Sequence, residues 1–582
     1  MFVICFAVTG PVAAQAPQPH ILHLPLMYDV EFYSNPFQLG FTIDYMVEDC
    51  IFDPMVAFSL NGTAIPMLAS SWSTSTDGLT WTFNLVHNAV WHDGVPLTSA
   101  DVKYTFDTGK QIQAPRFAVG LLNTAITSVD TPDNYTVVFH LNEPLADFLF
   151  NAGFAPIVPK HIWQNVTDPL NYANDHPIGS GPFMFQQRVP GQFISLVTNP
   201  NYYGQKPAYD GVLFTVYTNI DLRILALIKG DLDGETRVPA NSVAALLKAP
   251  NIQVITQSNP SNVYVQFNFH KYPLTIRQVR QAMTLAVDKK AMLSTILLGF
   301  GDQGSDGAIP PALTAWYNPD ATWLGAGLNS TQRLNEANAL LDSVGFKRGS
   351  DGIRVTPNGT RLEFQYYTAG AGLGFGTRPG ELFSSMVAPL GIKIDVNFID
   401  VGTLNSYLTL GTTYDMADWR YGVYGPGYLS DTFLTANTAG FWYSNATVDK
   451  LLIQQSQTVD YNQRKQLVFQ IQTMLMQDVP YIMLFHDNLV NAVRTDRYTG
   501  WNPSFLGQDG TGLYGVENVR AFIELTPVTS TPMTTSMMTS ATTSTAQSGA
   551  PDLTWAVVVL VIAVIALGAY VVKSRSSKNK TK

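Results

Sequence analysis

The aromatic and basic residues between Asp418 and Tyr428 form the segment of the sequence best suited to binding a small molecule. The segment reads Asp-Trp-Arg-Tyr-Gly-Val-Tyr-Gly-Pro-Gly-Tyr. Trp and Tyr combine a flat apolar ring with a polar atom, and such side chains line ligand pockets. We predict ligand contacts at Trp419, Arg420, Tyr421, Gly422, Tyr424 and Tyr428. The alternative is an aromatic surface loop without a role, because Tyr is abundant throughout the chain.

The sequence contains none of the motifs that usually mark an enzyme. There is no Gly-x-Ser-x-Gly elbow, no His-Glu-x-x-His, no Gly-x-x-x-x-Gly-Lys-Ser/Thr loop and no Cys-x-x-Cys pair. Glycines between Gly370 and Gly376 resemble a dinucleotide-binding loop, but their spacing does not fit. His20 and His23 are the only close pair of histidines, and we expect them to be solvated, with metal binding as the alternative. These patterns predict a binding protein with no catalytic residues, no cofactor and no metal site.

The composition excludes nucleic acid as a partner. The chain of 582 residues has a formal net charge of −10, and only 13% of its residues are charged. Phosphate binding needs clustered Lys and Arg on the folded part, whereas the clustered basic residues here lie in the last ten positions. The two cysteines are Cys5 and Cys50, and Cys5 lies in a predicted signal segment. The mature chain therefore has no partner with which Cys50 could form an internal disulfide.

The two ends of the chain carry export and membrane signals. Residues 1–16 resemble a signal peptide that ends in Ala-Gln-Ala and lacks a basic start, so the true start codon is expected further upstream. Residues 555–572 are uninterruptedly apolar, and a helix over 554–572 would rise about 28 Å, close to the thickness of the hydrocarbon core. The basic tail 573–582 places the cytoplasm after this helix. Residues 526–549, rich in Ser, Thr and Met, predict an extended stalk outside the membrane.

Six Asn-x-Ser/Thr sequons fit an exported glycoprotein, although several are expected by chance in a chain rich in Asn and Thr. They are at Asn61, Asn134, Asn165, Asn329, Asn358 and Asn445.

Between about residues 20 and 525, short strands alternate with amphipathic helices. Residues 79–85 alternate apolar and polar side chains with the period of a half-buried strand. Apolar residues between Leu334 and Val344 repeat at helical spacing and stop at Gly345, and a second helix is predicted over 462–477, before Pro480. The pattern predicts a body of the α/β or α+β class.

Seven short segments in this body resemble family 5 of the extracellular solute-binding proteins, which includes the dipeptide- and oligopeptide-binding class. They are 66–72 (PMLASSW), 77–83 (DGLTWTF), 91–102 (WHDGVPLTSADV), 177–183 (PIGSGPF), 199–203 (NPNYY), 279–283 (VRQAM), and 339–342 (ALLD) leading into Gly345-Phe346. They occur in the order of the family, and the resemblance extends over about residues 50–500. The C-terminal stalk and anchor are similar to those of archaeal members.

The resemblance implies a bilobal periplasmic-binding-protein-like fold of the large three-domain type, in which ligand is captured between closing lobes. Lobe I would comprise residues 20–50, 178–268 and 487–525, the extra domain 51–177, and lobe II 269–486, with hinges near 268 and 486. The implied function is the extracellular subunit of an ABC importer that binds peptides and delivers them to a permease driven by a cytoplasmic ATPase. The alternatives are an oligosaccharide-binding member of the family and a cell-surface receptor or adhesion glycoprotein.

The motifs also have structural readings. We expect Trp91 and the Asp93-Gly94 turn to fix a hairpin corner with His92 in a structural role, and Ser99 or Asp101 to cap a helix that starts near Val102. Gly179 and Gly181 are expected to permit a chain crossing.

Charged residues at positions that contact the peptide termini in members of the family bear on the ligand class. Arg378, before a predicted helix over 381–388, matches a position where peptide-binding members can carry a basic group facing the ligand carboxylate; a solvated arginine is the alternative. Peptide-binding relatives commonly place an Asp, the partner of the peptide amino terminus, three residues after the matched Trp419, and here that position is Gly422. Asp415 or Asp418 could supply the carboxylate.

Overall fold

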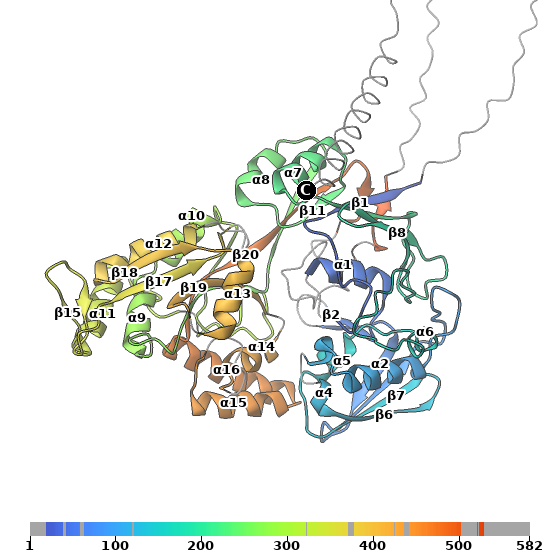
Figure 1. Cartoon of the computed structure of the whole chain (residues 1–582), viewed down its shortest axis with the longest axis horizontal. Coiled ribbons are helices and arrows are strands. Elements are labelled where there is room, and N and C mark those ends of the chain that lie inside the picture. Colours follow the sequence, from blue (N-terminus) through green and yellow to red (C-terminus); the bar gives the residue numbers. More distant parts are fainter. Residues whose placement is uncertain are drawn as a thin grey trace, which may run out of the picture. The chain divides into compact units, whose positions relative to one another are not determined.

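The computed structural model describes residues 19–38, 42–58, 63–118, 122–321, 323–370, 377–411, 413–423, 425–435, 442–501, 521 and 523–528 (Figure 1). Residues 1–528 form one compact unit, described below. The predicted signal peptide, the stalk from residue 529, the membrane helix 554–572, the basic tail, Asn61 and Tyr424 lie outside the described residues. Within the described ranges, no helix is both long and apolar enough to cross a membrane.

The first sheet joins the start of the chain to residues 183–216. Its order is β1-β10-β9-β8, with β1 parallel to β10. Its strands are β1 (Ile21–Leu26), β8 (Phe183–Val189), β9 (Phe193–Thr198) and β10 (Gly211–Val216). Leu22, Leu24 and Leu26 are completely buried, and their core also contains Met46 and Val47 of α1 (Thr42–Ile51).

The region predicted as the extra domain, and called so below, contains a second four-stranded sheet in the order β4-β5-β7-β6, a two-stranded sheet of β2 and β3, and several helices. Its elements are β2 (Val56–Phe58), β3 (Ala64–Pro66), β4 (Ala69–Thr74), β5 (Thr80–Leu85), α2 (Ser99–Gln111), α3 (Pro115–Ala118), α4 (Leu122–Ala125), β6 (Ile126–Asp133), β7 (Thr136–Leu141), α5 (Phe148–Gly153) and α6 (Lys160–Trp163). Strand β5 confirms the predicted strand. Thr98, rather than Ser99, is the N-cap of α2, and its backbone N–H donates to Asp101 Oδ2 at 2.8 Å.

An eight-stranded sheet forms the largest part of the body. Its main order is β11-β20-β13-β19-β17-β18, and β12 and β14 also pair with β20. The strands are β11 (Gly234–Glu235), β12 (Ile252–Ser258), β13 (Ser261–Phe267), β14 (Gly301–Gln303), β17 (Glu363–Thr368), β18 (Lys393–Phe398), β19 (Met416–Gly422) and β20 (Tyr481–Arg494). Strand β17 is parallel to both β18 and β19. The mixture of parallel and antiparallel pairs confirms the predicted combination of α/β and α+β features.

Helices cover this sheet, and apolar side chains hold them against it. They are α7 (Ile220–Lys229), α8 (Ala240–Leu246), α9 (Arg277–Ala286), α10 (Lys289–Ile296), α11 (Ser330–Ser343), α12 (Arg378–Val387), α13 (Val401–Leu410), α14 (Gly427–Phe433), α15 (Ala446–Gln457) and α16 (Tyr461–Asp478). Helices α11, α12 and α16 confirm the three predicted helices. The remaining described elements are a short 3-10 helix (Ala388–Leu390) and two small strand pairs, β15 (Lys347–Arg348) with β16 (Arg354–Val355), and β21 (Tyr498–Thr499) with β22 (Thr526–Pro527).

Strand β20 connects two parts of the eight-stranded sheet. Its first half pairs with β13, and its second half, from Asn488 to Arg494, pairs with β12. Strand β13 pairs along its whole length with β19. These pairings divide the sheet into a part that contains β12 and a part that contains β13 and β19. The chain passes between the two parts near Asn259–Ser261 and again near Asp487. The division into lobes with hinges near 268 and 486 stays a prediction.

A second close crossing joins the first sheet to the extra domain. A Cβ on Gly179 would lie 1.8 Å from the Ile51 carbonyl oxygen, and one on Gly181 would lie 2.6 Å from that of Cys50. The Gly179 N–H donates to His92 Nδ1 at 3.1 Å, and His92 Nε2 lies 3.0 Å from the Gly181 carbonyl oxygen. Burial lowers the pKa of His92 to about 4, so this imidazole is neutral and Nε2 carries the proton. These contacts confirm the structural roles predicted for His92 and the two glycines.

Candidate functional site

The carboxyl ends of β17, β18 and β19 form one edge of the sheet, and the segment predicted to bind ligand lies there. In register, Thr368 of β17 lies beside Phe398 of β18, and Tyr367 lies beside Ala417 of β19. Residues 418–422 therefore continue β19 beyond its pairing with β17. Ligands of open α/β sheets bind outside the carboxyl ends of parallel strands. This edge is the candidate site.

The aromatic residues of the segment occupy different environments. Trp419 is partly buried and packs against two apolar clusters, whereas 41% of Tyr421 is exposed. Tyr428, on α14, is completely buried. The rings of Tyr421 and Tyr428 lie 5.4 Å apart at 40°. Among the described aromatic side chains of this segment, Tyr421 is thus the most exposed, and Tyr428 packs beside it in the core.

Arg420 points toward the crossing strands rather than into open solvent. Its Nη2 lies 3.0 Å from Asp487 Oδ2, and about one tenth of each side chain is exposed. The Ser261 hydroxyl donates to the other oxygen of the Asp487 carboxylate. Gly422 pairs with Ser261 at the start of β13, and no side chain projects from this position toward a ligand. The ion pair therefore ties the candidate edge to both crossing segments.

Asp418 is a buried carboxylate with unused hydrogen-bonding capacity. Only 2% of the residue is exposed, and the Thr368 hydroxyl donates to its Oδ2 at 3.0 Å. Its Oδ1 has no hydrogen-bond partner, nor does the buried hydroxyl of Tyr366 in the same cluster. Burial raises the pKa of Asp418 to about 7. A ligand donor group at Oδ1 would remove part of the cost of burying this carboxyl group.

Asp415, the other acidic candidate, is already engaged at the opposite end of the strand. Its Oδ2 accepts the Gln365 backbone N–H at 2.8 Å, and its Oδ1 lies 4.0 Å from Lys271 Nζ. It comes before the first residue of β19, whereas Asp418 lies within the strand and next to Trp419. Asp418 is therefore the better placed substitute for an acid at Gly422.

Arg378 and Phe398 flank the same edge. Arg378 is the first residue of α12 and forms an exposed i,i+3 ion pair with Glu381, at 3.7 Å. Phe398, the last residue of β18, is 61% exposed, and a Cβ on Gly370 would lie 2.3 Å from its ring. Sequence analysis missed Phe398, although a large apolar residue at a strand's carboxyl end is a usable signal. No direct contact joins Arg378 to Trp419 or Arg420 among the described interactions.

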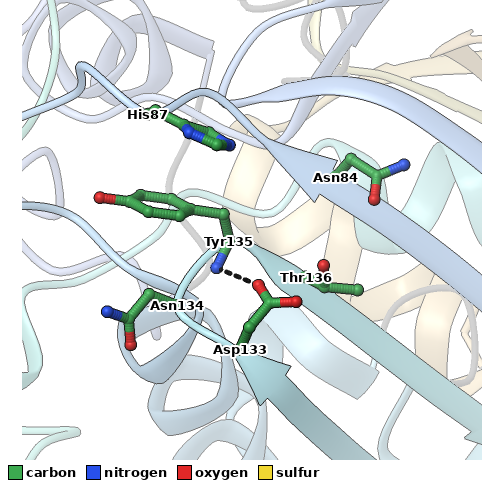
Figure 2. A pocket seen from close by; sticks show the side chains of 6 residues that line it. All are labelled: Asn84, His87, Asp133, Asn134, Tyr135 and Thr136. Atoms are coloured by element: carbon green, nitrogen blue, oxygen red, sulfur yellow. Dashed lines mark hydrogen bonds between the residues drawn. The ribbon is translucent and has the colours of Figure 1, made fainter.

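A shallow hollow of about 600 Å³ lies elsewhere, on the extra domain (Figure 2). The His87 and Tyr135 rings stack beside it at 4.1 Å and 14°, and the Tyr135 backbone N–H donates to Asp133 Oδ1. Its lining contains the sequon residue Asn134 but none of the residues predicted to bind ligand. The chemistry at the carboxyl edge therefore does not extend to this hollow. The described ranges contain no group of three or more His, Cys, Asp or Glu that could hold a metal ion.

Comparisons with known proteins place this geometry in a wider group. The profile described as "Bacterial extracellular solute-binding proteins, family 5 Middle" matches residues 63–449. The probable D,D-dipeptide-binding periplasmic protein DdpA of Escherichia coli is 29% identical over 442 residues, which are 74% of this chain and 80% of that protein. The oligopeptide-binding protein AppA of Bacillus subtilis is 26% identical over 445 residues, 72% of this chain and 78% of its own.

Solved structures share the fold at low sequence identity. NikZ of Campylobacter jejuni, solved in complex with Ni(L-His), has a TM-score of 0.73 and 21% identity, and the match covers 88% of this chain and 100% of that one. AppA of Bacillus subtilis, solved in complex with a nonapeptide, has a TM-score of 0.70 and 21% identity with the same coverage. The similarity to these structures confirms the mixed α/β periplasmic-binding-protein fold.

Proposed function

Because the chain belongs to family 5 of the bacterial extracellular solute-binding proteins, we propose that it is the substrate-binding subunit of an ABC importer. The observation that carries this proposal is the family match over residues 63–449, which includes the whole candidate edge of the sheet. The subunit captures its ligand outside the cell and delivers it to a permease driven by a cytoplasmic ATPase. The absence of enzyme motifs from the sequence agrees with a role in binding.

The ligand class proposed first is a short peptide. Relatives named as dipeptide- and oligopeptide-binding proteins support it. Asp418 supports it from this chain, because its unpartnered Oδ1 can accept a hydrogen bond from the protonated amino terminus. Arg378 provides a positive charge at the same edge for the peptide carboxylate. Asp418 is buried and Arg378 is exposed, and a charge of each sign at one edge suits a zwitterionic ligand.

An oligosaccharide is the second candidate, favoured by exposed aromatic side chains at the same edge. Tyr421 is 41% exposed and Phe398 is 61% exposed. Flat rings of this kind stack on sugar rings as well as on peptide side chains. An oligosaccharide carries no ammonium group, so it would gain nothing from the charge of Asp418.

The capture mechanism proposed here is closure of lobes around the ligand, with Arg420 and Asp487 at the junction. Ligand at the carboxyl edge would lie next to Trp419 and Tyr421, and the crossing segments near Ser261 and Asp487 would bend. Domain closure needs only a few residues that absorb the change in backbone angles. No covalent step is required.

We further propose that a C-terminal helix over 554–572 anchors the body to the membrane, with the stalk 526–549 between them. This proposal rests on the apolar length and on the basic tail alone. Of the sequons in described ranges, Asn134, Asn165, Asn329 and Asn358 are exposed and are proposed as the acceptors for glycans. Asn445 is a weaker acceptor, because it is only partly exposed and its Nδ2 donates to the Asp478 carboxylate at 2.7 Å.

A thermal-shift screen of residues 20–525 tests the proposed function. The body would be heated with peptides, cello- and malto-oligosaccharides and nickel in separate wells. A ligand at about 100 times its dissociation constant adds about 2.7 kcal/mol to the free energy of unfolding. We expect stabilisation by peptides with free termini. Stabilisation by oligosaccharides alone would support the second candidate, and stabilisation by none of the three classes would contradict both.

A further inference from the structure

The turn between α15 and α16 contacts the extra domain, although about 310 residues separate the two segments in the sequence. The Ala146 backbone N–H donates to the Ser456 carbonyl oxygen at 2.7 Å. Gln457 Nε2 donates to Glu143 Oε2 at 3.0 Å. These contacts join the loop before α5 to a helical hairpin that packs against the eight-stranded sheet.

A buried ion pair lies at the centre of this contact. Arg464 Nη2 lies 2.5 Å from Asp147 Oδ2, with side-chain exposures of 6% and 17%. Arg464 Nε donates to Gln455 Oε1 at 3.0 Å, and its guanidinium lies 5.4 Å from the centre of the Trp316 ring. Gln455 and Trp316 thus hold the Arg464 side chain, and its Nη2 contacts the Asp147 carboxylate.

The side chain of Asp147 does not cap the helix that begins after it. It is the N-cap residue of α5, yet its side chain makes no hydrogen bond to the first turn of that helix. An N-cap Asp normally satisfies one of these free backbone N–H groups. Here the carboxylate is directed to Arg464 instead. The first turn of α5 therefore lacks a capping hydrogen bond from Asp147, and the carboxylate joins two segments that are distant in sequence.

Close apolar packing accompanies the polar contacts. Gly78, with φ of +71°, lies in the turn before β5, where a Cβ would come within 2.8 Å of Val459 Cγ2 and 3.2 Å of Pro144 Cβ. The turn approaches Val459 closely because Gly78 has no side chain. Figure 1 shows α15 and α16 near α4 and α5, away from the part of β20 that crosses between the two groups of strands. The contact is therefore separate from the crossing strands, and it joins the extra domain to helices that pack against the eight-stranded sheet.

We propose that Asp147 and Arg464, with Ala146, Ser456, Glu143 and Gln457, form a clasp that holds the extra domain against the second lobe and thereby sets the affinity for ligand. A contact that is made in the closed form and broken in the open form stabilises the closed form by its own free energy, with or without ligand and without touching it. Because the closed form retains ligand, a weaker clasp lowers affinity through faster dissociation. Asp147 and Arg464 act as positioning residues.

The matched variants are Asp147→Asn, which removes the charge at constant shape, and Asp351→Asn as the control. Asp351 forms an ion pair with Arg361 at 2.5 Å, but both side chains are about half exposed and lie within one lobe. Exposed pairs contribute little, whereas loss of one partner from a buried pair leaves the other charge unpaired. The Asp147 side chain makes no capping hydrogen bond to α5. Its replacement by Asn therefore removes no hydrogen bond from that helix.

Small-angle scattering of the ligand-free body is the first measurement, and it does not depend on the identity of the ligand. We expect a larger radius of gyration for Asp147→Asn than for the wild type and the control. The second measurement is the dissociation rate of trialanine, which should rise at least about tenfold in Asp147→Asn and stay unchanged in the control. The second measurement alone rests on the proposed peptide ligand.

Each outcome decides the proposal. An unchanged radius of gyration in Asp147→Asn overturns the clasp, whether or not trialanine binds. Failure of trialanine to bind the wild type counts against the peptide ligand but leaves the scattering result to decide the clasp. If Asp147→Asn does not fold, Arg464→Lys, which keeps the charge but loses the Nε bond to Gln455 and the Nη2 contact to Asp147, must increase the radius of gyration in the same direction. An unchanged radius in that variant also overturns the proposal.

Discussion

Arg420 of β19 and Asp487 of β20 form an ion pair at 3.0 Å that links the candidate ligand edge to the segment where the chain crosses between two groups of strands. The Ser261 hydroxyl, at the other crossing, donates to the same carboxylate. A ligand contact that shifts β19 would therefore move Arg420 and change its contact with Asp487, which joins both crossings. Under the proposed mechanism, these three side chains would connect ligand binding to lobe closure.

Removal of the Arg420 charge should destabilise the body. Arg420→Met leaves Asp487 buried with only the Ser261 hydroxyl as a described partner, and loss of one partner of a buried pair costs about 3 kcal/mol. Urea unfolding of both proteins measures the difference in the free energy of unfolding. The control is Arg361→Met, which breaks two exposed pairs, with Asp351 and Glu363, and should cost no more than about 1 kcal/mol. Equal losses in the two variants would show that Arg420–Asp487 is no stronger than a surface pair.

The raised pKa of Asp418 predicts a specific pH dependence of stability. An Asp in the unfolded chain titrates near 3.9, whereas burial raises the pKa of Asp418 to about 7. Between these values the folded state binds more protons than the unfolded state, so the contribution of Asp418 to stability falls as pH rises from about 4 to about 7. Asp418→Asn keeps an acceptor for Thr368 and removes this loss.

Calorimetric melting at pH 4.5 and pH 8 checks this prediction. Asp418→Asn should melt at about the wild-type temperature at pH 4.5 and at a higher temperature at pH 8. Other buried acids, including Glu48 and Asp53, whose pKa values are also raised to about 7, are common to both proteins and cancel in the comparison. The same temperature shift at both pH values would show that Asp418 is not protonated in the folded state.

The close crossing at Gly179 should tolerate no side chain. A Cβ there would lie 1.8 Å from the Ile51 carbonyl oxygen, so Gly179→Ala requires the backbone to separate and should cost more than about 3 kcal/mol or prevent folding. Gly402→Ala, in α13, is the control, because it meets only Asp400 Oδ1 at 3.3 Å. Ala at a helical position should be neutral or stabilise by about 0.5–1 kcal/mol. Expression yield and thermal melting of both variants measure the contrast, and similar stability would contradict the described crossing.

The proposed anchor predicts a change in solubility on truncation. Deletion from Ser548 onward removes the apolar residues 555–572 and the basic tail. We expect the truncated chain to be released from membranes as folded protein, because the body does not need the anchor to fold. Carbonate extraction followed by circular dichroism tests both points. Recovery of the truncated form as an integral membrane protein would rule out this anchor.

Local patterns predicted the elements, whereas contacts between distant segments decided the site. The spacing of Leu334, Leu341 and Gly345 was sufficient for α11, because helix periodicity and a C-terminal glycine are local signals. The pairing of β13 with β19 was not predictable in this way, since it joins residues about 150 positions apart. The same limit applies to the unpartnered Oδ1 of Asp418 and to the use of Asp147 by Arg464, because a sequence pattern does not show which partners a buried carboxylate lacks.

Phe398 and Gly422 illustrate the two kinds of outcome at the site. Phe398 was missed because the sequence does not show whether an apolar side chain at the end of a strand is buried, and here it is 61% exposed beside Gly370. Gly422 drew attention because peptide-binding relatives commonly have an Asp at this position. The structure places it at the end of β19 beside Ser261, where it has no side chain to anchor a ligand. Asp418, four positions earlier, is the buried carboxylate at this edge whose Oδ1 has no described hydrogen-bond partner.

Titration calorimetry with trialanine and N-acetyl-trialanine tests most directly whether the chain captures peptides through an acidic group at the sheet edge. Both peptides would be titrated into the wild-type body and into Asp418→Asn, with Asp415→Asn as the control for a carboxylate engaged elsewhere. We expect the free peptide to bind the wild type and Asp415→Asn at least about tenfold more tightly than the acetylated one, and this preference to disappear in Asp418→Asn. Equal affinity of the wild type for the two peptides, or binding of neither, would contradict peptide capture through Asp418.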